Sequence, residues 1–174
     1  MKNLPIIPGK TIYLGPVPDT PKFYQEYLSW LNQDRVKKGT GSDSLTLEEV
    51  TQMHQEWRND PKNITFCIFE AQTNEPIGDI NLRYGVENYD NDGPETAIMI
   101  GKNFGQGKGR EAMNLLLDYA FKTLNLPIIN LSVYKDNHPA VKLYQGLGFK
   151  TVKEGLDEGK EEYIMELKKE EWIK

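Results

Sequence analysis

A short run of alternating glycines does most to constrain how this chain can fold. Gly105, Gly107 and Gly109 lie between an apolar, strand-like run at 97–100 and a helix-patterned run at 111–124. Because glycine lacks a Cβ atom, such a turn can point several backbone N–H groups at one anion, and the following helix adds its positive end. The pattern therefore favours a strand–loop–helix unit that binds a phosphorylated ligand. A mobile surface turn is the alternative.

The size and composition of the chain are those of one ordinary globular domain. It has 174 residues, of which 38% are hydrophobic and 27% charged, so we expect a single domain over residues 1–174. No apolar run approaches the ~20 residues of a membrane span, and the N-terminus lacks a signal-like hydrophobic segment. The single cysteine, Cys67, is expected to be a buried thiol in a reducing compartment. We therefore expect a cytoplasmic protein that does not act at a membrane.

The charge of the chain limits its partners. A net charge of −5 argues against a nucleic acid, because phosphate contacts need a basic surface. It fits a cationic partner, although mild acidity is common among soluble proteins. His54 and His138 stand apart in the pattern, and no Cys/His cluster has metal-ligand spacing, so we predict no metal site.

Alternating and helical patterns give the order of the elements. We expect strands at 11–14, 64–71, 76–84, 95–101, 128–134, 149–154 and 161–168. Helices are expected from Pro21, from a capping box at 46–49, over 111–124, and from Pro139 to Gly146. The polar segment 33–44 is expected to be a loop. This order predicts one mixed α/β sheet rather than two domains.

Two nucleotide-binding motifs match the glycine loop only in part. A nucleotide-hydrolase P-loop fails, because Lys102 stands where its first glycine is required and no hydroxyl residue follows Lys108. The segment 107–112 does match the dinucleotide-binding pattern Gly-x-Gly-x-x-Gly/Ala. However, its best ribose-binding acid, Asp136, comes late, and about 100 residues precede a motif that normally opens its domain. We therefore disfavour both motifs.

Three segments together resemble the GNAT N-acetyltransferases. They are 95–101, 104–112 and 137–149, the last with an Asn, a Tyr seven residues later and a Gly-Phe pair. The segments 28–32 and 76–80 resemble the branch that acetylates alanine N-termini of ribosomal proteins, spermidine and nucleotide-linked amino sugars.

The resemblance covers nearly the whole chain, from about residue 10 to 167. It implies the GNAT-like acyl-CoA N-acyltransferase fold, with a mostly antiparallel, twisted sheet of six to seven strands and about four helices. A homodimer is compatible with the family.

The resemblance also implies that acetyl-CoA is the cosubstrate and assigns residues to it. The loop would hold the pyrophosphate through Phe104, Gly105, Gln106, Gly107, Lys108, Gly109 and Arg110. The backbone of Ile98, Met99 and Ile100 would pair with the pantetheine arm and polarise the thioester carbonyl. Asn137 would hydrogen-bond the pantetheine or the adjoining backbone, besides starting a helix. Phe104 replaces the Gln, Arg or Trp common in the family, which leaves open the side chain that covers that edge of the loop.

Two residues would carry the chemistry of acetyl transfer by direct attack of an amine on the thioester. Tyr144 matches the family's general acid, which protonates the departing thiolate; a packing tyrosine is the alternative. Glu95 stands where relatives carry a glutamate that acts as a base through water, although an edge-strand carboxylate fits equally. Asp79 and Glu70 are weaker candidates, and a mechanism without a dedicated base stays open.

The acceptor is the least determined part. A small-molecule or peptide amine fits: a protein N-terminus, a polyamine or an amino sugar. We expect it near Trp30, the segment 33–44 and the acidic loop 87–92. The competing function is a coenzyme A-binding module that senses acetyl-CoA without turnover.

Overall fold

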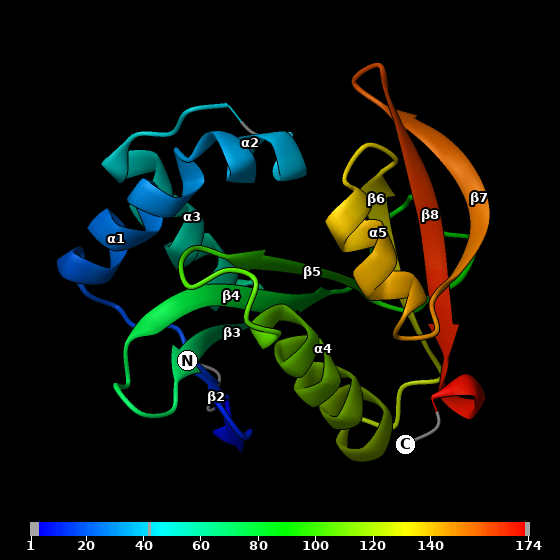
Figure 1. Ribbon diagram of the computed structural model, residues 1–174, viewed down its shortest axis with the longest axis horizontal. Helices are drawn as coiled ribbons and strands as arrows, with labels where there is room; N and C mark the ends of the chain where they lie inside the picture. Colours follow the sequence, from blue (N-terminus) through cyan, green and yellow to red (C-terminus); the bar gives the residue numbers. More distant parts are fainter. Residues whose placement is uncertain (1–3, 42, 173–174) are drawn as a thin grey trace.

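The structure is a computed structural model that describes residues 4–41 and 43–172 (Figure 1). Its described part contains an eight-stranded sheet in the order β1-β2-β3-β4-β5-β6-β8-β7. Neighbouring strands are antiparallel except β5 and β6, which are parallel. The strands are β1 (Ile7–Pro8), β2 (Ile12–Pro16), β3 (Asn63–Glu70), β4 (Pro76–Arg83), β5 (Glu95–Ile100), β6 (Ile128–Tyr134), β7 (Lys150–Asp157) and β8 (Lys160–Lys168).

Helices cover both faces of this sheet (Figure 1). They are α1 (Pro21–Leu31), α2 (Asp34–Thr40), α3 (Leu47–Asn59), α4 (Lys108–Asp118), which continues into a π-helical turn at Tyr119–Thr123, and α5 (His138–Gln145), with a 3₁₀ turn at Lys169–Glu171. The predicted mixed, mostly antiparallel α/β fold is confirmed. The described residues form one strand and one helix more than the predicted upper numbers, namely the two-residue β1 and α2.

Two apolar clusters hold the layers together. On one face, α4 and α5 pack against alternating residues of the strands, with Leu116 of α4 in the same cluster as Phe66 and Ile80 of the sheet. On the other face, α1, α2 and α3 pack around Trp30 over Cys67 and Met99 of the sheet. Alternation along each strand therefore sends its side chains into two different cores, which is why both faces are covered. Cys67 is buried, as predicted.

The predicted helix starts are found at α1 and α3. Thr20 Oγ1 accepts a hydrogen bond from the Phe23 N–H at 3.2 Å, directly before Pro21. Thr46 and Glu49 form the predicted capping box, each side chain bonding the other's backbone N–H. Satisfying these first-turn donors fixes where each helix begins.

The prediction of a loop over 33–44 was wrong, because residues 34–40 form α2. Asp34 lies in its first turn and lysines lie in its last turn, so both ends match the helix dipole. Gly41 ends it at φ +69°, a conformation that glycine adopts without strain. Val36 is buried against the cluster of α1 and α3, so tertiary packing supports this short helix. Ser42, also in the predicted loop, lies outside the described residues.

The described residues contain neither a membrane-spanning helix nor a metal-binding cluster. No helix there is both long and apolar enough to cross a bilayer. No group of three or more His, Cys, Asp and Glu side chains in the same part of the chain is arranged to hold a metal ion.

Candidate active site

The parallel strands β5 and β6 separate soon after they meet. Glu95 pairs with Asn130, whose N–H donates to the Pro94 carbonyl at 2.9 Å. Among the described residues this is the one paired position between the two strands, and beyond it they diverge (Figure 1). A cavity of about 820 Å³ lies at this divergence, lined by β5, the glycine loop, α2, α5 and the ends of β6, β7 and β8.

The unpaired edge of β5 presents backbone groups to this opening. Hydrogen-bonded pairs alternate along an antiparallel ladder, and the Gly101 N–H donates to Ile77 on the β4 side at 2.7 Å. The backbone N–H and C=O groups of Met99 therefore also point toward β4, and those of Ile98 and Ile100 point toward the opening. Ile98 and Ile100 thus have the orientation that the sequence analysis expected of amides that pair with an extended ligand.

The glycine loop has a backbone shape that suits an anion. Gly105 and Gly107 have φ of +73° and +76°, and a Cβ atom at either would meet no heavy atom within 4 Å. Gly107 is also the N-cap of α4 and supplies no side-chain cap, so the first N–H groups of α4 are left for a ligand or water. The residues present therefore fit a phosphate group. Gln106 is exposed and is not among the residues that line the cavity.

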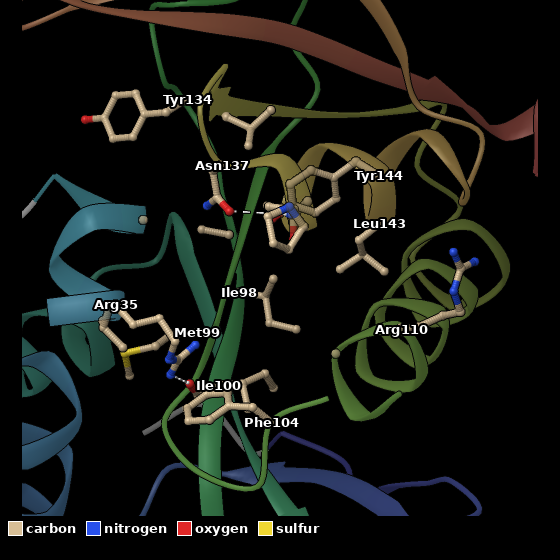
Figure 2. A pocket seen from close by; sticks show the side chains of 18 of the residues that line it. Arg35, Ile98, Met99, Ile100, Phe104, Arg110, Tyr134, Asn137, Leu143 and Tyr144 are labelled. Carbon is tan, nitrogen blue, oxygen red and sulfur yellow. Dashed lines mark hydrogen bonds between the residues drawn. The ribbon is translucent and has the colours of Figure 1, made fainter. Parts of the chain in front are cut away.

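The two cations of the loop have partners within the protein. Lys108 is buried and its ammonium forms an ion pair with Glu70. Arg110 is exposed and its guanidinium donates to the Gly146 carbonyl at the end of α5, at 3.1 Å. In Figure 2 the Arg110 side chain points away from Phe104. Lys108 is therefore neutralised within the protein, whereas Arg110 is held by a neutral carbonyl.

Tyr144 and Asn137 come to the cavity on α5. The Asn137 side chain caps this helix by accepting from the Ala140 N–H at 3.4 Å (Figure 2). Tyr144 is 7% exposed and its ring packs edge-on to Phe149. Burial, with a smaller contribution from the charge of Glu95, raises the pKa of the Tyr144 phenol to about 12. The phenol is thus a protonated donor over the physiological pH range.

Glu95 lies at the opposite end of β5 from the glycine loop and is 7% exposed. It forms an ion pair with Arg83 and accepts a hydrogen bond from the Tyr89 hydroxyl at 2.7 Å. Burial and the charge of Glu95 raise the pKa of Tyr89 above its ordinary value. The carboxylate is therefore held in place at the cavity wall by two named partners.

The other proposed bases lie away from the cavity. Asp79 is 4% exposed and is not among the lining residues, and Glu70 is bonded to Lys108. Trp30, expected beside the acceptor, is buried beneath Gly101, where a Cβ atom would lie 2.1 Å from its ring. Of the acceptor elements that the sequence suggested, segment 33–44 lines the cavity, and the acidic loop reaches it indirectly through Tyr89.

Several polar lining residues were not named as site residues by the sequence analysis, among them Arg35, Arg83, Tyr134, Asp157 and Glu162. Tyr134 donates to Asp157 at 2.5 Å, and Glu162, which is Tyr134's neighbour across β6 and β8, accepts from Asn88 at 3.4 Å. Their residue types carry no motif, so only the pairing of distant strands could have revealed them. Arg35 is the side chain that covers the edge of the glycine loop at Phe104, because its guanidinium carbon lies 3.1 Å from the centre of that ring.

Comparison with known proteins decides the family. The family model described as an acetyltransferase (GNAT) domain matches residues 14–150. The chain belongs to the GNAT acetyltransferases. It is therefore an N-acetyltransferase, and enzymes of this family use acetyl-CoA.

Curated relatives of this GNAT enzyme carry a common name. An N-acetyltransferase 9-like protein of Caenorhabditis briggsae is 33% identical over 161 residues, which cover 87% of this chain and 80% of the relative. The alpha/beta-tubulin-N-acetyltransferase 9 of Drosophila melanogaster is 31% identical over 147 residues, which cover 76% of this chain and 73% of the relative. The sequence motifs had suggested the branch of the family that acetylates ribosomal-protein N-termini, spermidine and nucleotide-linked amino sugars.

Solved structures share the fold. The spermidine N-acetyltransferase of Vibrio cholerae, determined with CoA and spermine, matches with a TM-score of 0.79 at 23% identity, over 94% of this chain and 99% of that one. This similarity shows the GNAT fold.

Proposed function

We propose that this N-acetyltransferase transfers the acetyl group of acetyl-CoA to the α-amino group of a protein N-terminus by direct attack. The observation that carries the proposal is the opening between β5 and β6 beside the glycine loop. Acetyl-CoA supplies the acetyl group as a thioester. An extended arm with a diphosphate at one end matches an unpaired strand edge that leads to an uncapped helix N-terminus.

The cosubstrate would be held along β5 and the loop. The backbone of Ile98 and Ile100 would pair with the amides of the arm, and the N–H groups at the start of α4 would bind the diphosphate. At the other end of β5, the thioester carbonyl would meet the backbone donors that the strand leaves unpaired. A fixed donor of this kind is typically worth about 3 kcal/mol of transition-state stabilisation.

Tyr144 would act as the general acid. It lines the cavity as a buried, protonated phenol, with Asn137 on the same helix. Its proton would pass from the phenolic oxygen to the departing sulfur. A pKa near 12 keeps this proton available at neutral pH, but it also makes the phenol a weak acid, so transfer depends on close positioning at the sulfur.

Glu95 would accept the proton that the attacking amine must lose. Arg83 and Tyr89 fix its carboxylate at the cavity wall, so a water molecule is the natural carrier between it and the amine.

The carboxylates of the cavity wall favour a positively charged acceptor. Glu95, Asp157 and Glu162 line the cavity, and the guanidinium of Arg83 is paired with Glu95. Two neighbouring residues of the loop between β4 and β5 bond these carboxylates, since Tyr89 donates to Glu95 and Asn88 donates to Glu162. An acidic, partly enclosed wall attracts an ammonium group before it is deprotonated.

A protein N-terminus is the acceptor class that the relatives support best. The name of the Drosophila relative says that it acetylates tubulin, a protein substrate. A peptide that enters from solvent needs an open groove, and the cavity is lined in part by exposed residues of α2 and β7, Arg35 and Asp157. A polyamine is the competing cation.

A matched set of acceptors tests the proposal. Purified chain is incubated with acetyl-CoA and peptides with a free α-amine, the same peptides with a blocked N-terminus and an internal lysine, or spermidine. Thiol release and mass spectrometry then report turnover and the modified nitrogen. We expect acetylation of the free α-amine alone. Turnover confined to spermidine or to lysine would overturn the proposed acceptor class, and binding without thiol release for any amine would favour a sensor.

A further inference from the structure

The cations that line the cavity differ in their partners. Arg83 and Lys108 are each paired with a carboxylate, Glu95 and Glu70 respectively. Within the described residues, Arg35 and Arg110 instead donate to neutral groups. Arg110 extends toward the end of α5, whereas Arg35 lies beside Phe104 and Ile100 (Figure 2). Of the four, Arg35 is thus the one at the edge of the loop whose charge no carboxylate balances.

Two contacts hold the Arg35 guanidinium at the start of the glycine loop. Its Nη2 donates to the Ile100 carbonyl at 2.8 Å, and its plane covers the Phe104 ring at 3.1 Å. Phe104 remains 40% exposed, so the guanidinium caps an aromatic ring at the surface. Partial burial lowers the pKa of Arg35, as expected for a cation that has lost water without gaining a counter-charge.

The helix that carries Arg35 is fixed across the opening. Gln33 donates to the Gly101 carbonyl at 3.1 Å, and Val36 is buried in the cluster of α1 and α3. Further along α2, a Cβ atom on Gly39 would lie 3.3 Å from the Asn137 amide nitrogen. The helix therefore spans from the loop to the start of α5, and it presents Arg35 where β5 leads into the loop.

The present partner of Arg35 is one that a ligand would take. The register turns the Ile100 carbonyl toward the opening, where the proposed cosubstrate arm would pair with it. A displaced guanidinium has the glycine loop as its nearest neighbour, through Phe104. Guanidinium groups bind phosphate oxygens with paired, charge-assisted hydrogen bonds that are stronger than a bond to a neutral carbonyl.

Resting on the proposed function, we propose that Arg35 binds the diphosphate of CoA, exchanging the Ile100 carbonyl for phosphate oxygens when the ligand enters. Arg35 is then a cofactor-binding residue contributed by α2, outside the glycine loop. It supplies the positive charge that Lys108 cannot, because Lys108 is neutralised by Glu70.

Calorimetric binding measurements on the full chain test this assignment. The ligands are CoA and 3′-dephospho-CoA, which share the diphosphate. We expect Arg35→Gln to weaken binding of both about tenfold and Arg35→Lys to recover part of the loss. The difference between wild type and Arg35→Gln should shrink as salt is raised, because salt screens a charge interaction.

A second variant on the same helix controls for charge alone. Lys38 is exposed and lies 3.9 Å from Asp136, so Lys38→Gln removes the same charge from α2 without touching the loop. We expect its affinity for CoA to stay within about twofold of wild type. Thermal melts of all variants report whether α2 remains folded. A crystal structure with CoA should show Arg35 on the diphosphate and away from Ile100.

The outcomes separate this inference from the proposed function. Wild type that binds neither ligand would defeat both. Wild type that binds while Arg35→Gln binds equally well would defeat the Arg35 assignment alone. A loss seen with CoA but not with 3′-dephospho-CoA would move Arg35 to the 3′-phosphate, and an equal loss in Lys38→Gln would reduce the effect to general attraction; each overturns the assignment.

Discussion

Lys108 and Glu70 form a buried ion pair that joins the first turn of α4 to the last residue of β3. Side-chain exposures of 8% and 20% mean that both charges have lost most of their water. Such a pair is costly to break from one side, since the remaining charge is left without its partner. The start of the helix that we assign to the diphosphate is thus tied to the sheet by electrostatics.

The variant Glu70→Gln should therefore lose stability. We expect the free energy of unfolding to fall by about 2–3 kcal/mol in denaturant titrations, because Lys108 stays buried and unpaired. Glu75→Gln is the matched control, since Glu75 is 62% exposed where it meets Lys102 and should change stability by less than about 1 kcal/mol. Equal effects in the two variants would contradict the idea that burial makes the Glu70 pair matter.

The glycine loop is tested by adding a branched side chain. Gly107→Val should abolish detectable CoA binding, because the valine would enter the space above the first turn of α4, and it should also add strain at φ +76°. Gly159→Val provides the control, since Gly159 has φ +84° and equally open surroundings in the β7–β8 turn, and it is neither a lining residue of the cavity nor part of the glycine loop. Both variants should lose similar stability, but only the first should lose binding by calorimetry.

Removing the Tyr144 hydroxyl should affect turnover more than binding. We expect Tyr144→Phe to lower kcat about 100-fold, with a change in CoA affinity of less than about threefold. Tyr119→Phe, where the ring packs on Phe66 in the π-helical turn, should leave both unchanged. Because the pKa of Tyr144 is about 12, its proton is not lost at moderately alkaline pH, so wild-type kcat should not decline between about pH 8 and 10. Parallel losses of turnover and affinity would remove Tyr144 from the acid role.

A carboxylate base predicts a pH-dependent defect. We expect Glu95→Gln to reduce kcat/KM about 100-fold near neutral pH, where most of the acceptor amine is protonated. Raising the pH supplies free amine and should recover much of the rate in the variant. Glu87→Gln, on the exposed acidic loop, serves as the control. A defect that stays constant across the pH range would mean that Glu95 positions groups and does not move a proton.

The buried Asp79 should make stability depend on pH. Burial raises the pKa of its carboxyl from 3.8 to about 7, so the folded chain holds a proton that the unfolded chain releases. Stability from this group is therefore full below about pH 4 and falls as the pH rises toward 7. We expect Asp79→Asn to stabilise the fold by about 2–4 kcal/mol at pH 8 and by little at pH 4 in chemical denaturation. Stabilisation that is the same at both pH values would contradict this assignment.

Much of this architecture could be predicted because the local sequence signals favour the same helices and strands that the tertiary packing requires. The capping box at Thr46 and the stripe of α4 each have one sensible interpretation in sequence. Helix α2 could not be predicted, because its seven residues carry a single strongly buried side chain, Val36. Its apolar partners come from α1 and α3, and only the assembled core reveals them.

The candidate site divides in the same way. The loop glycines and Tyr144 stand in motifs, so sequence placed them in one functional group, and the structure brings them around one cavity. The partners of Lys108 and the position of Arg35 depend on contacts between segments 38 and 65 residues apart, for which a single sequence holds no signal. The acidic wall of Asp157 and Glu162 depends likewise on the pairing of β6, β7 and β8.

In the described part of the chain, β5 and β6 pair only at Glu95 and Asn130, so the two halves of the sheet are joined by few main-chain hydrogen bonds. A bound molecule with its own amide groups would form main-chain-like hydrogen bonds there and would connect the two halves of the sheet. The amide groups are the same in every acyl carrier with a pantetheine arm, so the edge of β5 cannot distinguish one carrier from another. Selectivity between carriers must then come from the residues at the two ends of the opening.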